Sequence, residues 1–594
     1  MGGGCVPFVC RGPDDCGAGE ICSGGSCITP PPPPAVDRVS ILSPGGVILE
    51  GETRTLVAVA YDAAGNAIVG APIQWSSDAP DSVSVSADGV ATGGSTPGTA
   101  TLTASFSGES DTVTLTLLPP APAGRRVVVV DAEDGSLISG ALVRLEPDGL
   151  EATTDADGVA VFAAGGPSDV HVFSDAHDYV TIAQNTADDL LVALPRRTRS
   201  DRAGGITGGI LFDRVRTQGE ISVGLAGLSL GQSLPDVDLV SLMGEVFVIH
   251  LDFGGQTQDV PLPGGMVAEA EFNGFPFSIK NRFYARGRDG LRAAWAFAGR
   301  LSFDRFSGGG SATARLSRIL PLFSLFEHGL VPRILVSEMD TVVDTGDIDG
   351  DGDTTERVPD WNAFPARNLT PAQTQTLRVH VDPPAMPTYQ GAPTDAVVLL
   401  AGNRLGRLGL LPLGLSATEL PQNGGTEAPP VTMKLAPVYG GLEAGVYQLL
   451  ALAVPFGDTS SGNFDAPREA SVRVVTATTL PPDLQLDSFL PFASGSYDAA
   501  SRTLQADAVP GASLTRFVLA APEGRWIVYG QGALSETLPA PPAGFADLAA
   551  EATASVSPIQ LRSDLSADNL LSPAGPTLVD LDTVTTAYSR VNLP

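Results

Sequence analysis

Short apolar runs with a period of two, separated by glycine and proline, constrain the fold of this chain most strongly. Runs such as Ser82–Ser86, Ala100–Ala104 and Thr112–Thr116 alternate apolar with small polar residues, as half-buried strands do. The 68 glycines and 49 prolines fall between such runs, without a collagen-like period. Because 594 residues exceed what one hydrophobic core supports, the pattern predicts a mainly β, multidomain string of β-sandwiches with few helices.

All five cysteines lie in the first 27 residues, which are too few to form an apolar core. Their even spacing, with no histidine nearby, favours disulfides over zinc and therefore an oxidising compartment. Two bridges can form in three connectivities, which the sequence leaves open, among Cys10, Cys16, Cys22 and Cys27. Cys5 is left over.

Cys5 follows three glycines, a degraded match to a lipoprotein processing site, so we expect it to be lipidated. A free or intermolecular thiol is the alternative. No apolar signal-peptide core precedes Cys5, so we expect that the signal peptide is missing from this sequence or was removed. No stretch reaches the roughly 18 apolar residues of a spanning helix, so we expect membrane attachment only through lipid or a partner. The segment Asp15–Cys22 resembles the Cys-rich modules that open many secreted proteins of myxobacteria.

The formal net charge of −32 excludes one class of partner. Binding to nucleic acid needs clustered Lys and Arg to displace counterions from the phosphates, so we expect no nucleic acid partner. The one basic cluster is interpreted as a flexible junction, with a protease-sensitive site as the alternative; it consists of Arg196, Arg197, Arg199 and Arg202.

Residues 1–29 are read as the Cys-rich module and residues 30–35 as a stiff proline linker. Beyond them, a set of motifs spans residues 36–118: Ile73-x-Trp75-Ser76-Ser77, Asp88-Gly89-Val90-Ala91-Thr92-Gly93 and Gly98-Thr99-Ala100. This stretch resembles the bacterial Ig-like group 2 family. The resemblance implies an Ig-like sandwich, with Trp75 as core anchor, that serves as a surface spacer or adhesive unit without catalytic residues.

Residues 125–195 contain Asp131…Gly135, Ser139-Gly140-Ala141-x-Val143 and Thr154-Asp155-x-Asp157-Gly158. These motifs resemble the carboxypeptidase regulatory-like, transthyretin-type family. The resemblance implies a β-sandwich that accompanies other domains and has no active site of its own.

In the remaining chain we recognise no family. We expect a β-rich domain over residues 203–375, a sandwich-like domain over 376–480 and a β-rich C-terminal domain over 484–594. In the first of these, strands are predicted at Val246–Phe253, Phe277–Ala285 and Leu291–Phe303, and a helix at Ser311–Leu325. A short helix is predicted in the last, at Ala546–Ala552.

The run from Asp347 to Asp353 places carboxylates at alternate positions, with glycines that allow a tight turn. It does not complete an EF-hand, because the twelfth position is Val358, and it resembles the calcium loops of dockerins and thrombospondin type 3 repeats. A solvated acidic turn is the alternative. We expect a structural calcium ion with ligands drawn from Asp347, Asp349, Asp351, Asp353, Glu356 and Asp360.

No residue pattern predicts a catalytic site. Gly227-Leu228-Ser229-Leu230-Gly231 matches the nucleophile elbow, but the surroundings predict a β-meander rather than strand-turn-helix. No pair of histidines has metal-binding helical spacing, so packing is the preferred role of His171, His177, His250, His328 and His380. His250 with Asp252, and His380 with Asp382, are read as incidental pairs on one strand face.

Together these features indicate an exported structural or adhesive protein on the outer surface of a Gram-negative bacterium. Its expected partners are other surface proteins or polysaccharide, and self-assembly is compatible with the pattern. One alternative is a surface enzyme or glycan-binding protein with its site in 203–480, which a deep pocket with converging His, Asp or Glu would favour. Another is a subunit of an extracellular assembly, which an exposed apolar strand edge would favour.

Overall fold

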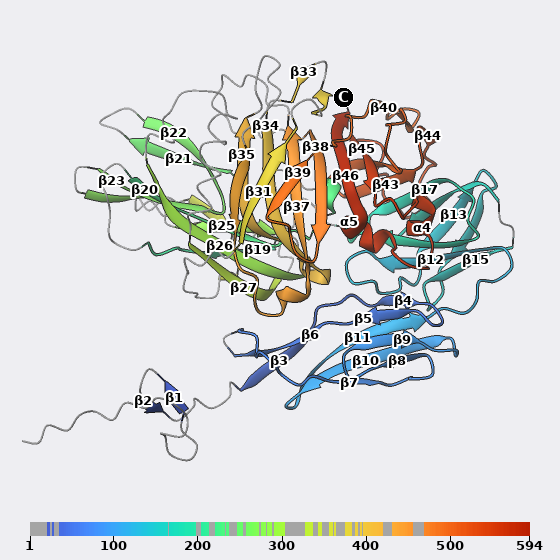
Figure 1. The fold of residues 1–594 in the computed structure, drawn as a ribbon. Helices are drawn as coiled ribbons and strands as arrows, with labels where there is room; N and C mark the ends of the chain where they lie inside the picture. The colour runs from blue at the N-terminus through green and yellow to red at the C-terminus, as the bar shows by residue number, and fades with distance from the viewer. Residues whose placement is uncertain are drawn as a thin grey trace, which may run out of the picture.

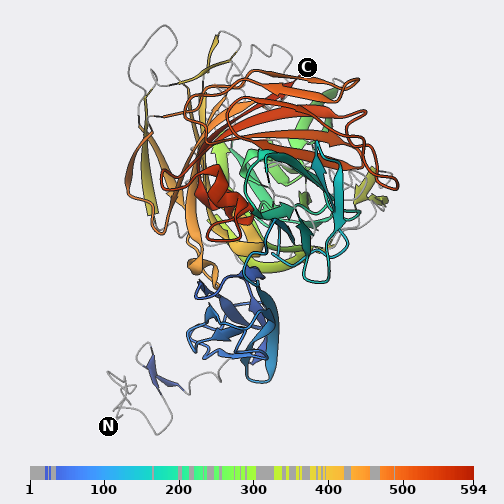
Figure 2. The same cartoon turned by 90° about the vertical axis from the view of Figure 1, so that its right-hand side faces the viewer.

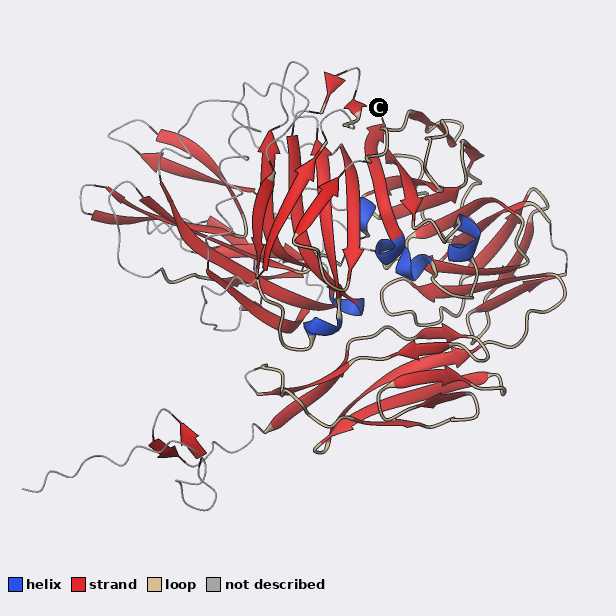
Figure 3. Ribbon diagram, in the orientation of Figure 1, coloured by secondary structure: helices blue, strands red, loops and turns tan. Residues whose placement is uncertain are grey.

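The structure is a computed structural model in which strands dominate and helices are few (Figure 3). The predicted mainly β fold class is therefore confirmed. Among the described residues, no helix is both long enough and apolar enough to cross a membrane. The structure describes residues 21–23, 26–28, 35–63, 65–163, 166–197, 204–212, 220–231, 233–236, 246–252, 257–272, 275–280, 282–287, 290–302, 327–336, 343–346, 356–359, 362–363, 375–382, 386–389, 392–394, 396–419, 430–454, 469–486 and 488–593.

A small hairpin represents the Cys-rich module. Strands β1 (Ile21–Ser23) and β2 (Ser26–Ile28) pair antiparallel, and their register sets the Cα atom of Cys22 opposite that of Cys27. Cys5, Cys10 and Cys16 lie outside the described residues. The disulfides and the lipidation of Cys5 therefore remain predictions.

Residues 36–118, the Ig-like domain, form a sandwich around its own core. One sheet has the order β4-β11-β10-β7, and the others are β3-β6 and β5-β9-β8. Trp75 packs only partly buried against this core, beside Gly89, whose φ of 78° suits glycine. The strands are β3 (Val36–Ile41), β4 (Gly46–Ile48), β5 (Thr53–Thr55), β6 (Ala58–Asp62), β7 (Gln74–Ser77), β8 (Val83–Val85), β9 (Val90–Gly93), β10 (Gly98–Phe106) and β11 (Glu109–Leu117).

Three further sandwiches share one plan, with four strands in one layer and three in the other. In the second sandwich (125–195), β13 (Leu142–Glu146), β14 (Leu150–Thr153), β16 (Ser168–Phe173) and β17 (Tyr179–Asn185) face β12 (Arg125–Asp131), β15 (Val159–Phe162) and β18 (Asp189–Leu194). In the third (376–480), β34 (Ala396–Leu405), β35 (Gly409–Glu419), β37 (Val446–Val454) and β38 (Ala470–Ala477) face β31 (Gln375–Val381), β36 (Val431–Leu435) and β39 (Asp483–Leu486). In the C-terminal sandwich (484–594), β42 (Leu514–Ala521), β43 (Gly524–Gly530), β45 (Thr553–Leu561) and β46 (Thr585–Leu593) face β40 (Gly495–Asp498), β41 (Thr503–Ala506) and β44 (Leu534–Thr537).

The three four-stranded layers join edge to edge in one 12-stranded sheet. Strand β17 pairs in parallel with β43, so that Tyr179 lies opposite Trp526. On the other side β46 pairs antiparallel with β38, and Tyr588 lies opposite Val472. The C-terminal sandwich therefore lies between the other two, although it comes last in the chain (Figures 1 and 2).

The middle domain (203–375) adds a five-stranded sheet, β24-β23-β20-β26-β27, and a three-stranded sheet, β25-β19-β30. Hairpins β21–β22 and β28–β29 accompany them. The predicted strands correspond to β21, β24 with β25, and β26; the predicted helix lies outside the described residues. The strands are β19 (Gly204–Gly208), β20 (Glu220–Leu228), β21 (Val246–Asp252), β22 (Thr257–Pro263), β23 (Met266–Phe272), β24 (Phe275–Lys280), β25 (Phe283–Gly287), β26 (Gly290–Ser302), β27 (Glu327–Val336), β28 (Val343–Gly346), β29 (Glu356–Pro359) and β30 (Asn362–Ala363).

Short helices pack against the main core near the C-terminus, where the sequence predicted none. They are α4 (Ala567–Leu571), η7 (Leu578–Asp580) and α5 (Leu581–Val584), and capping boxes from Ser566 and Thr577 begin the first two. The predicted helix at Ala546–Ala552 is wrong, because this segment forms turns. There the Asp547 carboxylate accepts a hydrogen bond from the Ala549 amide, and Tyr497 donates to the Ala549 carbonyl, which competes with helical bonding.

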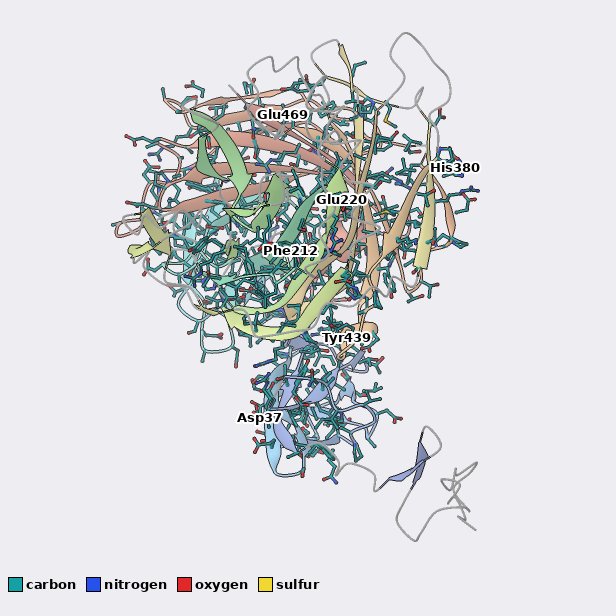
Figure 4. All side chains as sticks on the ribbon, turned by 90° about the vertical axis from the view of Figure 1, so that its left-hand side faces the viewer. Asp37, Phe212, Glu220, His380, Tyr439 and Glu469 are labelled. Atoms are coloured by element: carbon teal, nitrogen blue, oxygen red, sulfur yellow. The ribbon has the colours of Figure 1, made fainter. Side chains whose placement is uncertain are left out.

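The Ig-like domain lies below the other sandwiches in Figure 1 and is joined to them by hydrogen bonds and apolar contacts, two of which mark the ends of the contact. The Gly45 amide donates to the Asp134 carbonyl at 2.7 Å, and the Tyr61 hydroxyl donates to the Gly440 carbonyl at 3.3 Å. Tyr439, next to the second contact, lies at the end of the body that faces this domain (Figure 4). The proline linker therefore precedes a docked domain.

Candidate functional site: a charged junction between the sandwiches

A cavity of about 340 Å³ lies where the sandwiches meet. The Ig-like domain, the middle domain and all three fused sandwiches contribute to its lining. Four arginines and four acidic residues lie in its wall: Arg196, Arg404, Arg516, Arg525, Glu133, Asp236, Asp580 and Asp582.

Asp236 connects the middle domain to the C-terminal sandwich. It ends the short helix η2 (Leu234–Asp236), and its carboxylate accepts two hydrogen bonds from Arg516, at 2.8 and 2.9 Å. Arg525 donates a third at 2.9 Å. Burial alone would raise the pKa of Asp236, but the two guanidinium groups outweigh it and hold that pKa far below its usual range. The carboxylate is therefore ionised at any ordinary pH.

Asp178 extends this network across the seam between β17 and β43. Its carboxylate is fully buried and accepts hydrogen bonds from the Arg525 amide at 2.9 Å and the Arg525 Nε at 2.7 Å. Arg525 thus bridges Asp178 of the second sandwich and Asp236 of the middle domain.

Asp582, at the start of α5, forms a second node. It accepts hydrogen bonds from the Ser233 hydroxyl at 3.0 Å and the Leu234 amide at 2.8 Å, both beside η2. Arg404 of the third sandwich approaches it at 3.0 Å and donates through Nε to Gln448 at 2.8 Å. Both ends of the η2 turn are therefore held by charged partners.

A third node, on Asp131, contains the residue types of a hydrolase triad. His177 Nε2 lies 3.2 Å from Asp131, and His177 Nδ1 lies 3.0 Å from the Ser174 hydroxyl. Burial alone would raise the pKa of Asp131, but hydrogen bonds from His177 and Arg196 hold it at about 2. Ser174 and His177 belong to one turn, and Arg196 already neutralises the carboxylate at 2.6 Å. The contacts of these residues therefore hold the turn against β12.

Chemically, the junction is balanced. Each node pairs carboxylates with guanidinium groups, and buried ions are tolerated only when they are paired in this way. Within the described ranges, no group of His, Cys, Asp and Glu could hold a metal ion. The arrangement suits a structural connection that forms only when the separate parts of the chain come together.

The predicted calcium site lies almost wholly outside the described residues. Glu356 belongs to β29, where its Cα lies opposite that of Gly346 at the end of β28. The acidic run from Asp347 onward therefore connects the two strands of a hairpin. The calcium ion remains a prediction.

Ser229 has a structural role. It is buried, donates a hydrogen bond to the Leu408 carbonyl and accepts one from the Ala293 amide at 2.9 Å. The next described element after its strand is η2, a 3-10 turn of three residues that starts at Leu234 and not at the serine, so the geometry does not fit a nucleophile elbow.

His171 and His380 have separate partners in different sandwiches. His171 is buried against Thr181 at 2.8 Å, and burial together with the nearby Arg144 lowers its pKa to about 4. His380, on the outer surface in Figure 4, pairs with Asp483 at 2.7 Å rather than with Asp382. The side chains of His250 and Asp252 lie outside the described residues.

The prediction of a flexible junction at the basic cluster is wrong for its first two residues. Arg196 pairs with Asp131 and Asp134, and Arg197 donates to the carbonyls of Ser174 and His177. Both arginines are held in place because their hydrogen bonds outweigh the conformational entropy that two long side chains lose. Arg199 and Arg202 lie outside the described residues.

Comparison with known proteins yields no family. No family model and no curated protein matches the chain. Among solved structures, domains 5 and 6 of the S-layer protein SbsC match at a TM-score of 0.14 and 12% identity, covering 42% of this chain and 98% of that one. Trypsin-activated alpha-2-macroglobulin from Escherichia coli matches at 0.15 and 10%, covering 94% and 49%. The four N-terminal Ig domains of Dscam1 match at 0.14 and 9%, covering 76% and 100%. Scores this low carry no argument about arrangement or role.

Proposed function

We propose that this chain is an exported structural protein of a bacterial cell surface, which presents a rigid β-body to its partners. The observation that carries the proposal is the fusion of three sandwiches into one 12-stranded sheet, locked by the Asp236 and Asp582 nodes. Such a junction restricts the relative motion of domains, because the sandwiches share one hydrogen-bonded sheet and do not meet only through a small polar interface. A rigid body suits a load-bearing or spacing role better than catalysis by moving domains.

The surface chemistry supports the same proposal. Several arginines lie almost fully inside, namely Arg125, Arg126, Arg292 and Arg516. With a net charge of −32, the exterior is left acidic, which favours solubility and divalent cations rather than polyanionic partners. Other surface proteins or neutral polysaccharide are the partners that fit this charge.

Anchoring through a lipid on Cys5, disulfides in the Cys-rich module and calcium in the β28–β29 loop complete the proposal. They rest on the sequence patterns, and on the placement of Cys22 opposite Cys27. Together they describe a stapled stalk that carries a docked Ig-like domain and the fused body.

The location is tested on intact cells of the source bacterium. We expect added protease to digest the protein without lysis, and mass spectrometry of the membrane fraction to find a diacylglyceryl group on Cys5. A protein protected from protease until lysis contradicts surface exposure. An unmodified Cys5 in a surface-exposed protein overturns the lipid anchor alone.

A further inference from the structure

The 12-stranded sheet ends differently on its two sides. At one end, β35 is covered: the Leu230 amide donates to the Leu410 carbonyl at 2.7 Å and the reverse bond measures 3.0 Å. The Ala436 amide donates to the Leu413 carbonyl at 2.9 Å. Nearly the whole of β35 is buried, so this end of the sheet is closed.

At the other end β14 is open. Within the described part of the chain it pairs only with β13, and it lies beside β15, itself the last strand of its sheet. Figure 1 shows β13 and β15 at the end of the body opposite β21 and β22. The two edge strands expose large apolar side chains, with Leu150 at 40% and Val161 at 50% of full exposure. Strand β14 contains neither lysine nor proline, the residues that commonly block such edges.

We propose that the β14 edge is a self-association surface, on which β14 of a second copy pairs antiparallel and extends the sheet. The proposal rests on the structural role proposed above and names its contact. A second copy is the favoured occupant because this chain already assembles its sandwiches by edge pairing, at β17–β43 and β38–β46. An antiparallel edge is also self-complementary about a two-fold axis, which closes a dimer.

Charge and length determine how strong the contact is. Glu151, the acidic residue of β14, is paired with Arg144 at 2.6 Å and adds little net charge at the edge. The two copies still repel each other through a net charge of −32 each, so added salt strengthens association. A strand of four residues offers few hydrogen bonds, so the dimer is weak and needs a high protein concentration, such as the one at a crowded surface.

The test is sedimentation velocity of the purified full chain over a wide concentration range, at low and high salt. We expect a monomer–dimer equilibrium that salt shifts toward dimer. The double variant Leu150→Lys/Val161→Lys places four like charges at the contact and raises the dissociation constant by about tenfold or more. Both side chains are exposed, so the variant keeps the wild-type melting curve. Val69→Lys/Leu211→Lys, at positions 96% and 100% exposed elsewhere, is the matched control and dimerises normally.

Two outcomes overturn the inference. A chain that stays monomeric at every concentration and salt level has no self-association edge, and its open edge serves a different partner or none. A dimer that the edge variant leaves unchanged uses another surface. Neither outcome affects the proposed surface location, which is tested separately on intact cells.

Discussion

The Asp236 carboxylate accepts parallel hydrogen bonds from both terminal nitrogens of Arg516, although 280 residues separate the two in sequence. Arg516 is 2% exposed and lies on β42, near the middle of the 12-stranded sheet. A turn of the middle domain thus supplies the counter-charge that the C-terminal sandwich needs for a buried arginine. Neither part can bury its charge without the other, so the two are expected to fold together.

Replacing Asp236 with Asn should therefore destabilise the protein strongly. The change leaves the buried Arg516 guanidinium without its counter-ion, at an expected cost of about 3–5 kcal/mol. The measurement is the free energy of unfolding from urea titration of the full chain. The matched control is Asp564→Asn, which breaks the exposed pair of Asp564 with Arg562 at 2.6 Å. A surface pair of this kind contributes less than about 1 kcal/mol, so equal losses in the two variants would argue against the junction.

The strands of this fold can be predicted from the sequence, but not their assembly. The period-two pattern predicts that Arg516–Ala520 and Arg525–Tyr529 are strands, because one face of each must be apolar. It does not reveal that β43 pairs with β17, since any apolar strand offers the same backbone edge. Lateral fusion depends on which edges meet in space.

The charged junction could not be predicted for a related reason. Asp178, Asp236 and Arg525 belong to no spacing motif, and each is one charge among many in the sequence. Only the fold shows that they meet, because Arg525 donates hydrogen bonds to both carboxylates although each lies more than 280 residues away in the sequence. By contrast, a calcium loop is a local pattern, which is why the sequence alone predicts it.

Thr181→Val should weaken the seam between the second and C-terminal sandwiches. The Thr181 hydroxyl accepts a hydrogen bond from Trp526 Nε1 at 2.9 Å and lies 2.8 Å from His171 Nδ1, all fully inside the protein. Leaving such polar atoms without a partner costs about 1–3 kcal/mol. Hydrogen exchange should show faster opening of both β17 and β43. Protection lost in β17 alone would show that the seam does not couple the sandwiches.

Calcium removal should lower the melting temperature if the acidic run binds the ion. Chelation leaves the carboxylates at Asp347, Asp349 and Asp351 to repel one another, and the loop between β28 and β29 loses its cross-link. Differential scanning calorimetry with and without EGTA measures the shift. The double variant Asp349→Asn/Asp351→Asn should melt at one temperature under both conditions. A wild-type melting curve that ignores EGTA refutes the calcium site.

Glu536 gives the chain a pH dependence opposite to that of ordinary acidic residues. Burial, together with the nearby charge of Asp169, raises the pKa of Glu536 from 4.5 to about 8. The folded protein therefore binds more protons than the unfolded chain between these two values, so the contribution of Glu536 to stability falls as the pH rises across that window. Above this pH window, Glu536 is ionised in the folded protein, and burial of its charge lowers the stability by the full desolvation cost.

Glu536→Gln mimics the protonated acid and should remove this dependence. We expect the variant and the wild type to have similar unfolding free energies at pH 5. At pH 9 the variant should be more stable, by on the order of 2–4 kcal/mol. The exposed Glu551→Gln is the control, and its difference from the wild type should not change with pH. Parallel profiles for Glu536→Gln and the wild type would mean that water reaches the carboxylate in the folded protein, because only hydration could then keep it ionised without cost.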